Sequence, residues 1–170
     1  MLAEGTVAFT PDPGNTRLLR DAFGRFATGV TIVTTHSADG PVAVTASSFS
    51  SVSLTPPLVL WSADRGSRRF RFFEAADHYA IHVLSAEQDA LCFEVAGDPA
   101  ALQSSTLAVN DHGVPLLDGC LARFECTRHA TYDGGDHAIM LGHVDTALMR
   151  EDGNALTFYK GKLGQIAAMT

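Results

Sequence analysis

The region from Val44 to Ser62 has the residue types of a polar ligand site. It contains five clustered serines and no Lys, Arg, Asp or Glu, which is unusual for a solvated loop. Hydroxyl groups and free backbone N–H groups bind phosphate oxygens and the polar edge of a heterocycle. The segment therefore predicts an uncharged polar lining for a ligand, against the simpler alternative of a serine-rich hairpin. The clustered serines are Ser47, Ser48, Ser50, Ser51 and Ser53.

A second candidate site follows at Ser67, just before a pattern typical of a short helix. Phe70 and Phe73 lie three residues apart and share one face of that helix. With Ser67 as its cap, the helix start offers unpaired backbone N–H groups to an anion. The alternative is that Ser67 only caps the helix while the arginines face water, which we expect for Arg69 and Arg71.

His137 is the histidine whose surroundings best suit a functional role. It follows Gly134, Gly135 and Asp136 at the junction between a turn and a strand. Glycines allow the backbone to approach a ligand closely, and a strand start holds the imidazole rigidly. Composition alone favours an exposed histidine on a turn, so both interpretations stay open at this point.

The other histidines and the cysteines give no metal site. His36, His112 and His129 fall in or near predicted turns, where we expect them to be solvated. His78 and His82 share a face of a strand-like segment but have no third ligand nearby in sequence. The three cysteines are odd in number and lack a C-x-x-C pair, so we expect buried thiols rather than disulfides or zinc ligands.

Bulk composition predicts one soluble domain. The chain has 170 residues and a net charge of −7, which disfavours binding to nucleic acid or to anionic membranes. The N-terminus lacks the pattern of a secretion signal, so we expect a cytoplasmic protein. Residues 1–14 are expected to form a loose leader, and residues 15–170 a single domain.

The elements that must position these residues are mainly strands. A helix is expected at 16–27, a second after Ser67, and a third that opens with a capping box at Ser85–Gln88. Several strands with few helices predict a mainly β fold with flanking helices, closed as a barrel. No dinucleotide-binding or P-loop glycine motif is present. The expected strands are 30–35, 41–46, 58–61, 79–84, 121–129, 138–148 and 155–159.

Three stretches carry a family resemblance. Residues 26–35 read Phe-Ala-Thr-Gly-Val-Thr-Ile-Val-Thr-Thr, and residues 45–60 read Thr-Ala-Ser-Ser-Phe-Ser-Ser-Val-Ser-Leu-Thr-Pro-Pro-Leu-Val-Leu. With Val-Pro-Leu-Leu-Asp-Gly at 114–119 and Gly-Asp-His at 135–137, they closely resemble the flavin reductase family with the FMN-binding split β-barrel fold. The likeness runs from about residue 16 to residue 163.

The resemblance implies roles for particular residues. It implies that His137 lies on the nicotinamide side of a bound flavin, with Asp136 orienting that histidine or its loop. It implies that Ser51, Val52 and Ser53 lie near the flavin ring edge. It implies that the residues along the phosphate and ribityl side of the flavin are Thr45, Ala46, Ser47 and Ser48. It also implies that the residues around the phosphate itself are Ser62, Ser67 and Arg68.

The resemblance also implies an activity. The expected function is NAD(P)H:flavin oxidoreductase, in which a homodimer reduces FMN or FAD with NADH or NADPH and supplies a partner flavin-dependent monooxygenase. The alternative is a non-enzymatic electron carrier on the same barrel that retains its FMN. Residues 98–113 depart from the pattern of the family, so the role of this segment stays open.

Overall fold

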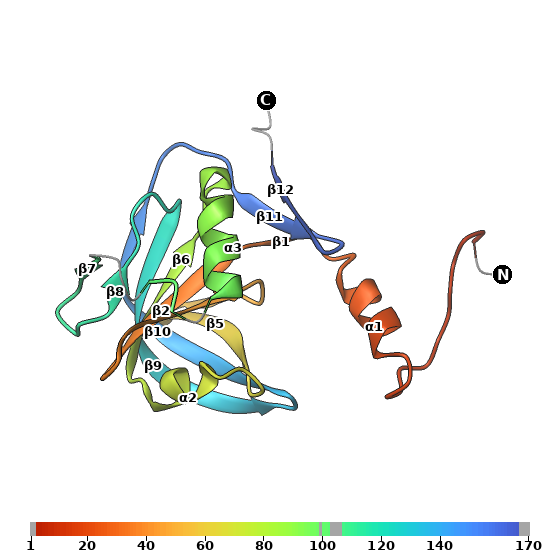
Figure 1. Ribbon diagram of the computed structural model, residues 1–170, viewed down its shortest axis with the longest axis horizontal. Coiled ribbons are helices and arrows are strands. Elements are labelled where there is room, and N and C mark those ends of the chain that lie inside the picture. Colours follow the sequence, from red (N-terminus) through yellow and green to blue (C-terminus); the bar gives the residue numbers. More distant parts are fainter. Residues whose placement is uncertain (1–2, 99, 103–106, 167–170) are drawn as a thin grey trace.

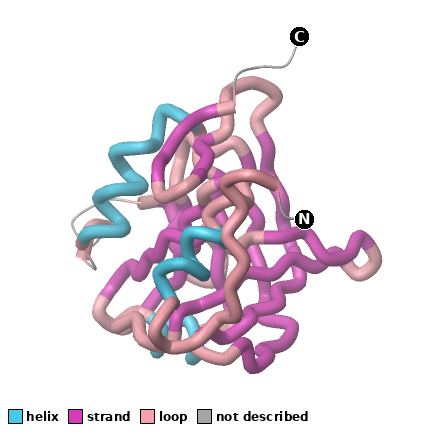
Figure 2. Tube along the Cα trace, turned by 90° about the vertical axis from the view of Figure 1, so that its right-hand side faces the viewer, coloured by secondary structure: helices cyan, strands magenta, loops and turns pink. Residues whose placement is uncertain are grey.

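The computed structural model describes residues 3–98, 100–102 and 107–166, which form a mainly β protein (Figure 1). Residues 1–2 of the expected leader and 167–170 of the expected domain lie outside these ranges. So do residues 99 and 103–106, within the segment that departs from the family pattern. Strands are the most frequent secondary structure, and the helices lie at the periphery of the molecule (Figure 2).

Seven strands form the main sheet, in which every neighbouring pair is antiparallel. Their order is β3-β2-β6-β9-β10-β5-β4. The sheet curls, so that the ends of β3 and β5 come to line one cavity. The strands are β2 (Thr31–Ser37), β3 (Gly40–Ala46), β4 (Ser50–Leu54), β5 (Pro57–Asp64), β6 (His78–Val83), β9 (Ala122–Gly134) and β10 (His137–Met149).

The remaining elements are smaller than this sheet. Five short strands form two further sheets, β1-β11-β12 and β7-β8. Helix α3 lies across the sheet near β3, whereas α1 stands away from the barrel (Figure 1). These elements are α1 (Thr16–Phe23), α2 (Phe70–Ala75), a 3₁₀ turn at Ala86–Gln88, α3 (Asp89–Gly97), β1 (Thr28–Gly29), β7 (Ala108–Val109), β8 (Pro115–Leu116), β11 (Leu156–Tyr159) and β12 (Lys162–Gln165).

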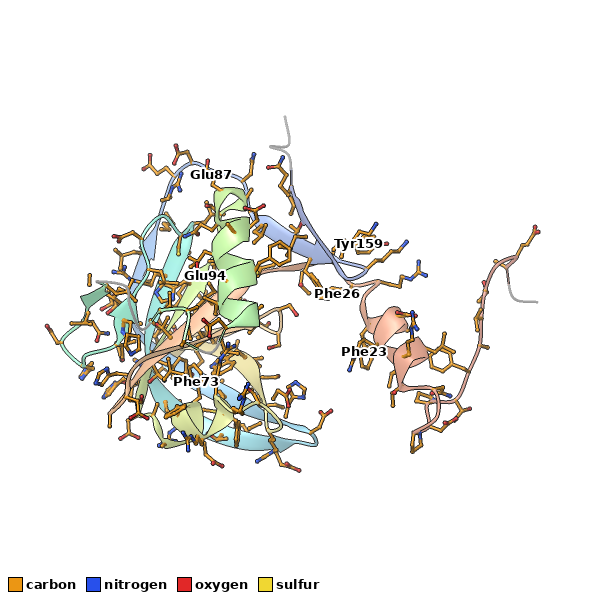
Figure 3. The ribbon with its side chains drawn as sticks, in the orientation of Figure 1. Phe23, Phe26, Phe73, Glu87, Glu94 and Tyr159 are labelled. Atoms are coloured by element: carbon orange, nitrogen blue, oxygen red, sulfur yellow. The ribbon has the colours of Figure 1, made fainter. Side chains whose placement is uncertain are left out.

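Two larger apolar clusters and one small one are found among the described residues, and the two larger ones hold the barrel together. Trp61 of β5, Phe73 of α2 and Tyr79 of β6 fill the first, and each is at most 1% exposed. Figure 3 labels Phe73. The second cluster joins Leu84 and neighbouring strand residues to Val95 of α3. Helix α3 therefore caps the sheet, while α2 is fixed to it by one buried phenylalanine beside the candidate site.

The predicted β-rich fold is confirmed, with local differences. The hairpin of β2 and β3 forms as expected, and Gln88 accepts a hydrogen bond from the Ser85 N–H at 3.1 Å, as the capping box predicts. The serine-rich segment is not a loop throughout, because Ser50–Leu54 forms edge strand β4 against β5. Ser67 does not cap a helix, because α2 begins only at Phe70.

Helix α1 differs most from expectation. It ends at Phe23, and none of its residues is buried. Phe23 and Phe26 are 69% and 77% exposed, although their spacing is that of a buried helical face. Figure 3 shows both on the segment that contains α1, called the arm below, which lies away from the barrel. The start of the helix was therefore predicted correctly, but the helix ends four residues earlier than the expected position 27, and its apolar face does not pack on this chain's barrel.

His82 of β6 is a buried neutral histidine. It is 0% exposed, and the Leu117 N–H donates to its Nε2 at 3.1 Å. The proton must then sit on Nδ1, which donates to the Ile32 carbonyl at 3.1 Å. Burial lowers the pKa of His82 to about 4, and the hydrogen bond to Ile32 only partly opposes this shift.

Because of His82, the free energy of unfolding is expected to fall in acid. Below about pH 6.5 the unfolded chain binds a proton that the folded chain does not accept until the pH nears 4. We expect His82 to lower the free energy of unfolding by about 2 kcal/mol between about pH 7.5 and pH 5. Urea unfolding across this range measures the effect. His82→Gln should remove this part of the pH dependence, and identical slopes in both proteins would contradict the assignment.

Gly142 of β10 allows a close approach of Tyr79. A Cβ at this position would lie well inside van der Waals contact with the Tyr79 hydroxyl and 3.1 Å from Cys126 Cβ. Gly142→Ala is expected to lower the free energy of unfolding by about 1–3 kcal/mol, because buried Tyr79 cannot move aside. Gly29→Ala is the control, since no atom of the described residues lies within 4 Å of a Cβ added there. Equal costs for both variants in urea unfolding would refute this explanation.

Candidate functional site

A cavity of about 210 Å³ lies where β3, β5, α2 and the start of β10 meet. Its apolar wall includes Val44, Phe70 and the buried rings of Trp61 and Phe73. The rings of Trp61 and Phe73 pack edge to face with centroids 5.1 Å apart. A rigid apolar wall of this kind suits the face of a planar ring.

A second part of the lining, called the hydroxyl wall below, is polar and comes from the end of β3 and the residues after it, the end of β5, and the turn before α2. It includes Thr45, Ala46, Ser47, Ser48, Ser62 and Ser67. The Ser62 N–H donates to Ser48 Oγ at 2.8 Å, and Thr31 Oγ1 donates to the Ala46 carbonyl at 2.8 Å. These bonds hold the wall in place. Ser47 and Ser62 also line the cavity, and a serine hydroxyl can donate a hydrogen bond to a ligand or accept one from it.

His137 reaches the cavity from the first position of β10. Its Nδ1 lies 2.7 Å from Asp136 Oδ1. The hydrogen bond with His137 lowers the pKa of the Asp136 carboxyl, which is therefore an ionised acceptor. Nδ1 then carries the proton and donates, and Nε2 stays available to a ligand. Asp136 does not line the cavity itself, so it acts by orienting the imidazole.

Arg65 ties the turn before α2 to the hairpin that carries His137. Its backbone N–H donates to the Asp136 carbonyl at 3.0 Å, and its Nε donates to the His137 carbonyl at 3.3 Å. Its guanidinium also pairs with Asp133 at 3.2 Å. The exposed ion pair adds little stability, but the three contacts together fix the turn before α2 relative to the hairpin that carries His137.

The structure brings most of the predicted site residues to this cavity but not all of them. Ser51, Val52 and Ser53 lie on edge strand β4 and do not line it, and Val52 is 48% exposed. Arg68 is exposed and also lies outside the lining. The predicted residues that do line the cavity are Thr45, Ala46, Ser47, Ser48, Ser62, Ser67 and His137.

Sequence reasoning missed Arg69, Trp61 and Phe70 as lining residues. Arg69 was expected to face water, yet it is half-buried and lines the cavity. It is the only arginine or lysine that does so among the described residues. The arginines at 68, 69 and 71 indicated positive charge near the site. Which of them lines the cavity depends on the path of the turn at 65–69, which the sequence does not reveal.

A larger cavity of about 630 Å³ adjoins the first. The two cavities share Thr45, Ala46 and Ser47. Phe93 of α3, together with Phe158 and Lys162 of the β11-β12 hairpin, lines the larger one. The shared residues form a common border, so a ligand longer than the first cavity has room to extend past Ser47.

The remaining histidines and cysteines form no metal centre within the described residues. His112 is exposed, as expected, and its ring stacks on His78 with centroids 3.7 Å apart. The three cysteines are free, and Cys120 is only half-buried, whereas Cys92 and Cys126 are buried as predicted. Burial raises the pKa of the Cys126 thiol to about 12, so it is not a nucleophile.

Comparison with known proteins shows the family. The model of the flavin reductase like domain matches residues 23–167, and the chain belongs to this family. FMN reductase (NADH) SmoA of Agrobacterium fabrum is 47% identical over 159 residues, which are 94% of this chain and 91% of that protein. The reductase component of flavin-dependent trigonelline monooxygenase of Acinetobacter baylyi is 44% identical over 132 residues, 76% of this chain and 42% of that protein.

A solved structure supports the same conclusion. NADH:FAD oxidoreductase SgcE6 of Streptomyces globisporus superimposes with a TM-score of 0.86 at 35% identity, covering 98% of this chain and 96% of that one. The same protein in complex with NAD and FAD fragments gives a TM-score of 0.85. The predicted split β-barrel is therefore confirmed. No helix in the described ranges has the length and apolar character needed to cross a membrane.

Proposed function

We propose that this protein is an NADH:flavin oxidoreductase that supplies reduced flavin to a separate monooxygenase. The observation that carries the proposal is the cavity with one aromatic wall, one hydroxyl wall and His137 at its edge. Relatives named as an NADH-dependent FMN reductase and as a monooxygenase reductase component support the same activity. The non-enzymatic carrier has no comparable support.

The residues present fit a flavin nucleotide. Trp61, Phe70 and Phe73 give an apolar surface for a ring, while the hydroxyl wall and Arg69 suit a phosphate-bearing tail. At about 210 Å³ the cavity is smaller than a typical ligand pocket, so the cofactor would extend along Thr45–Ser47 into the neighbouring cavity. Thr45, Ala46, Ser47, Ser48, Ser62 and Ser67 would hold it.

The protein's part in the reaction is positional. When bound, flavin and dihydronicotinamide together supply the hydride chemistry. His137 presents Nε2 to the nicotinamide side, and Asp136 fixes the ring orientation from the other side through Nδ1. The buried rings of Trp61 and Phe73 keep water from the inner wall. Hydroxyl groups with modest affinity suit a flavin that must leave for a partner enzyme.

The exposed arm supports a homodimer. Phe23 and Phe26, with Phe158 and Tyr159 of β11, leave a large apolar surface exposed. Figure 3 shows Phe23, Phe26 and Tyr159 on the same side of the molecule as α1. A second copy of the chain would bury this apolar surface.

The three free thiols suit the reducing cytoplasm, where NADH is available.

Steady-state turnover tests the proposed function. We expect NADH oxidation that depends on added flavin and saturates with it, measured with the four pairs of FMN or FAD and NADH or NADPH. NADH should be the better reductant, as the names of the relatives indicate. Absence of turnover with all four pairs, in protein shown to be folded, would overturn the proposal.

A further inference from the structure

Two buried polar atoms at the inner wall of the cavity make no hydrogen bond within the described residues. They are Trp61 Nε1 and the hydroxyl oxygen of Tyr79. Both side chains are at most 1% exposed, and their rings pack edge to face with centroids 6.1 Å apart. A buried polar group without a partner costs free energy, so two of them in one pair of contacting rings require an explanation.

The polar atom of Trp61 is directed at that of Tyr79. Burial raises the pKa of the Tyr79 phenol, the nearby Cys126 thiol adds to the rise, and the Trp61 N–H opposes part of it. An N–H group lowers the pKa of a phenol when it points at the phenol oxygen and stabilises the ionised form. The two groups therefore face each other, although their contact falls short of the geometry of a hydrogen bond.

The fold makes room for the Tyr79 hydroxyl at some cost. Gly142 of β10 lies beside it, and a Cβ at that position would overlap the hydroxyl oxygen. A phenylalanine at position 79 would keep the ring in the core and bury no unpartnered oxygen. The hydroxyl is therefore better explained by the indole that it faces than by the stability of the core.

Trp61 connects this pair to the ligand cavity. It lines the cavity, whereas Tyr79 lies behind it and does not. Phe73 and Tyr79 both pack edge to face on the indole. Apolar packing of this kind has little directional preference, whereas an N–H group and an oxygen attract each other along a defined line. The hydroxyl of Tyr79 can thus set the tilt of the indole.

We propose that Tyr79 is a positioning residue for the flavin: its hydroxyl accepts the Trp61 N–H and fixes the tilt of the indole against which the cofactor binds. This inference rests on the proposed function and adds to it a residue outside the cavity lining. Trp61 Nε1 and the Tyr79 oxygen are both shielded from the surface. The hydroxyl therefore acts on the cofactor through the ring of Trp61 and not by direct contact.

A double-mutant cycle on FMN binding tests the inference. Flavin fluorescence is titrated with wild type, Tyr79→Phe, Trp61→Phe and the double variant. We expect Tyr79→Phe to weaken FMN binding about 5- to 10-fold, with an unchanged or higher midpoint of urea unfolding because an unpartnered buried hydroxyl is removed. In the Trp61→Phe background the same change should alter FMN affinity less than about 2-fold.

The emission of Trp61 gives a second readout. Trp61 is the single tryptophan of the chain, so all tryptophan fluorescence comes from this wall. Tyr79→Phe should move the emission to shorter wavelength, because a polar group leaves the indole N–H. The matched control is Tyr132→Phe, which removes the hydroxyl of a tyrosine that is 56% exposed on β9. It should match wild type in emission, FMN affinity and urea midpoint.

Several results would overturn the role of Tyr79. Unchanged FMN affinity in Tyr79→Phe, with normal NADH-dependent turnover, would refute this inference alone. Equal losses in both backgrounds would show that the hydroxyl does not act through Trp61. A lower urea midpoint in Tyr79→Phe with unchanged emission would show a purely structural role. If Trp61→Phe does not fold, the affinity and emission of Tyr79→Phe decide the question. Absence of turnover with every cofactor pair in wild type that binds FMN would instead refute the proposed function.

Discussion

Ser47→Trp is expected to abolish flavin binding, with affinity reduced by about 100-fold or more. Ser47 is exposed at the common border of both cavities, so an indole ring there occupies the space that the cofactor needs. The same exposure means that the larger side chain does not disturb the core. Flavin fluorescence titration measures the affinity, and NADH oxidation with added flavin should fall in parallel.

Ser50→Trp is the matched control for this variant. Ser50 is also an exposed serine of the same segment, but it lies on edge strand β4 outside both cavities. It should bind flavin and turn over NADH like wild type. If both variants lose binding equally, a general disturbance of the segment explains the result. If Ser47→Trp binds flavin normally, the cofactor lies elsewhere.

His137→Ala is expected to lower kcat/KM for NADH by about 100-fold while leaving flavin affinity nearly unchanged. The imidazole lines the edge of the cavity and is fixed by the Asp136 carboxylate, so its loss removes a group that orients the nicotinamide. Steady-state kinetics with varied NADH and saturating flavin measure the effect. A direct flavin titration shows whether binding is retained.

Two companion variants sharpen the test of His137. Asp136→Asn keeps a hydrogen-bond partner for the ring but loses the charge, so we expect a smaller loss, of roughly 3- to 10-fold. His129→Ala removes an exposed histidine of the adjacent strand β9 and should leave kinetics unchanged. If His137→Ala keeps the wild-type kcat/KM for NADH, the nicotinamide does not use this residue.

Much of the fold was predictable because local pattern and final environment agree. Residues 31–35 are all threonine, isoleucine or valine, residue types with high strand propensity, and β2 forms there as a buried strand. Strand β4 was missed because serines carry little β propensity. That strand exists through its pairing with β5, which no local pattern reveals. For α1 the spacing of apolar residues predicted the helix, but spacing cannot tell which surface covers its face.

The candidate site was predictable where a motif fixes both residue and position. The hydroxyl wall from Thr45 to Ser48 and the Gly-Asp-His turn both reach the cavity. Which of Arg68 and Arg69 lines the cavity was not predictable from the sequence, because two adjacent arginines on an irregular turn point in different directions. Only the path of residues 65–69, fixed by contacts with the β9-β10 hairpin, places Arg69 inward.

The most direct measurement is reduction of FMN by NADH in the absence of oxygen, followed by the visible absorbance of oxidised flavin in a stopped-flow instrument. Wild-type protein should speed the loss of this absorbance far above the rate of free NADH and FMN, and the rate should saturate with both. Ser47→Trp should leave only the uncatalysed rate. If wild type gives no acceleration, or if Ser47→Trp gives the same acceleration as wild type, this cavity is not where flavin is reduced.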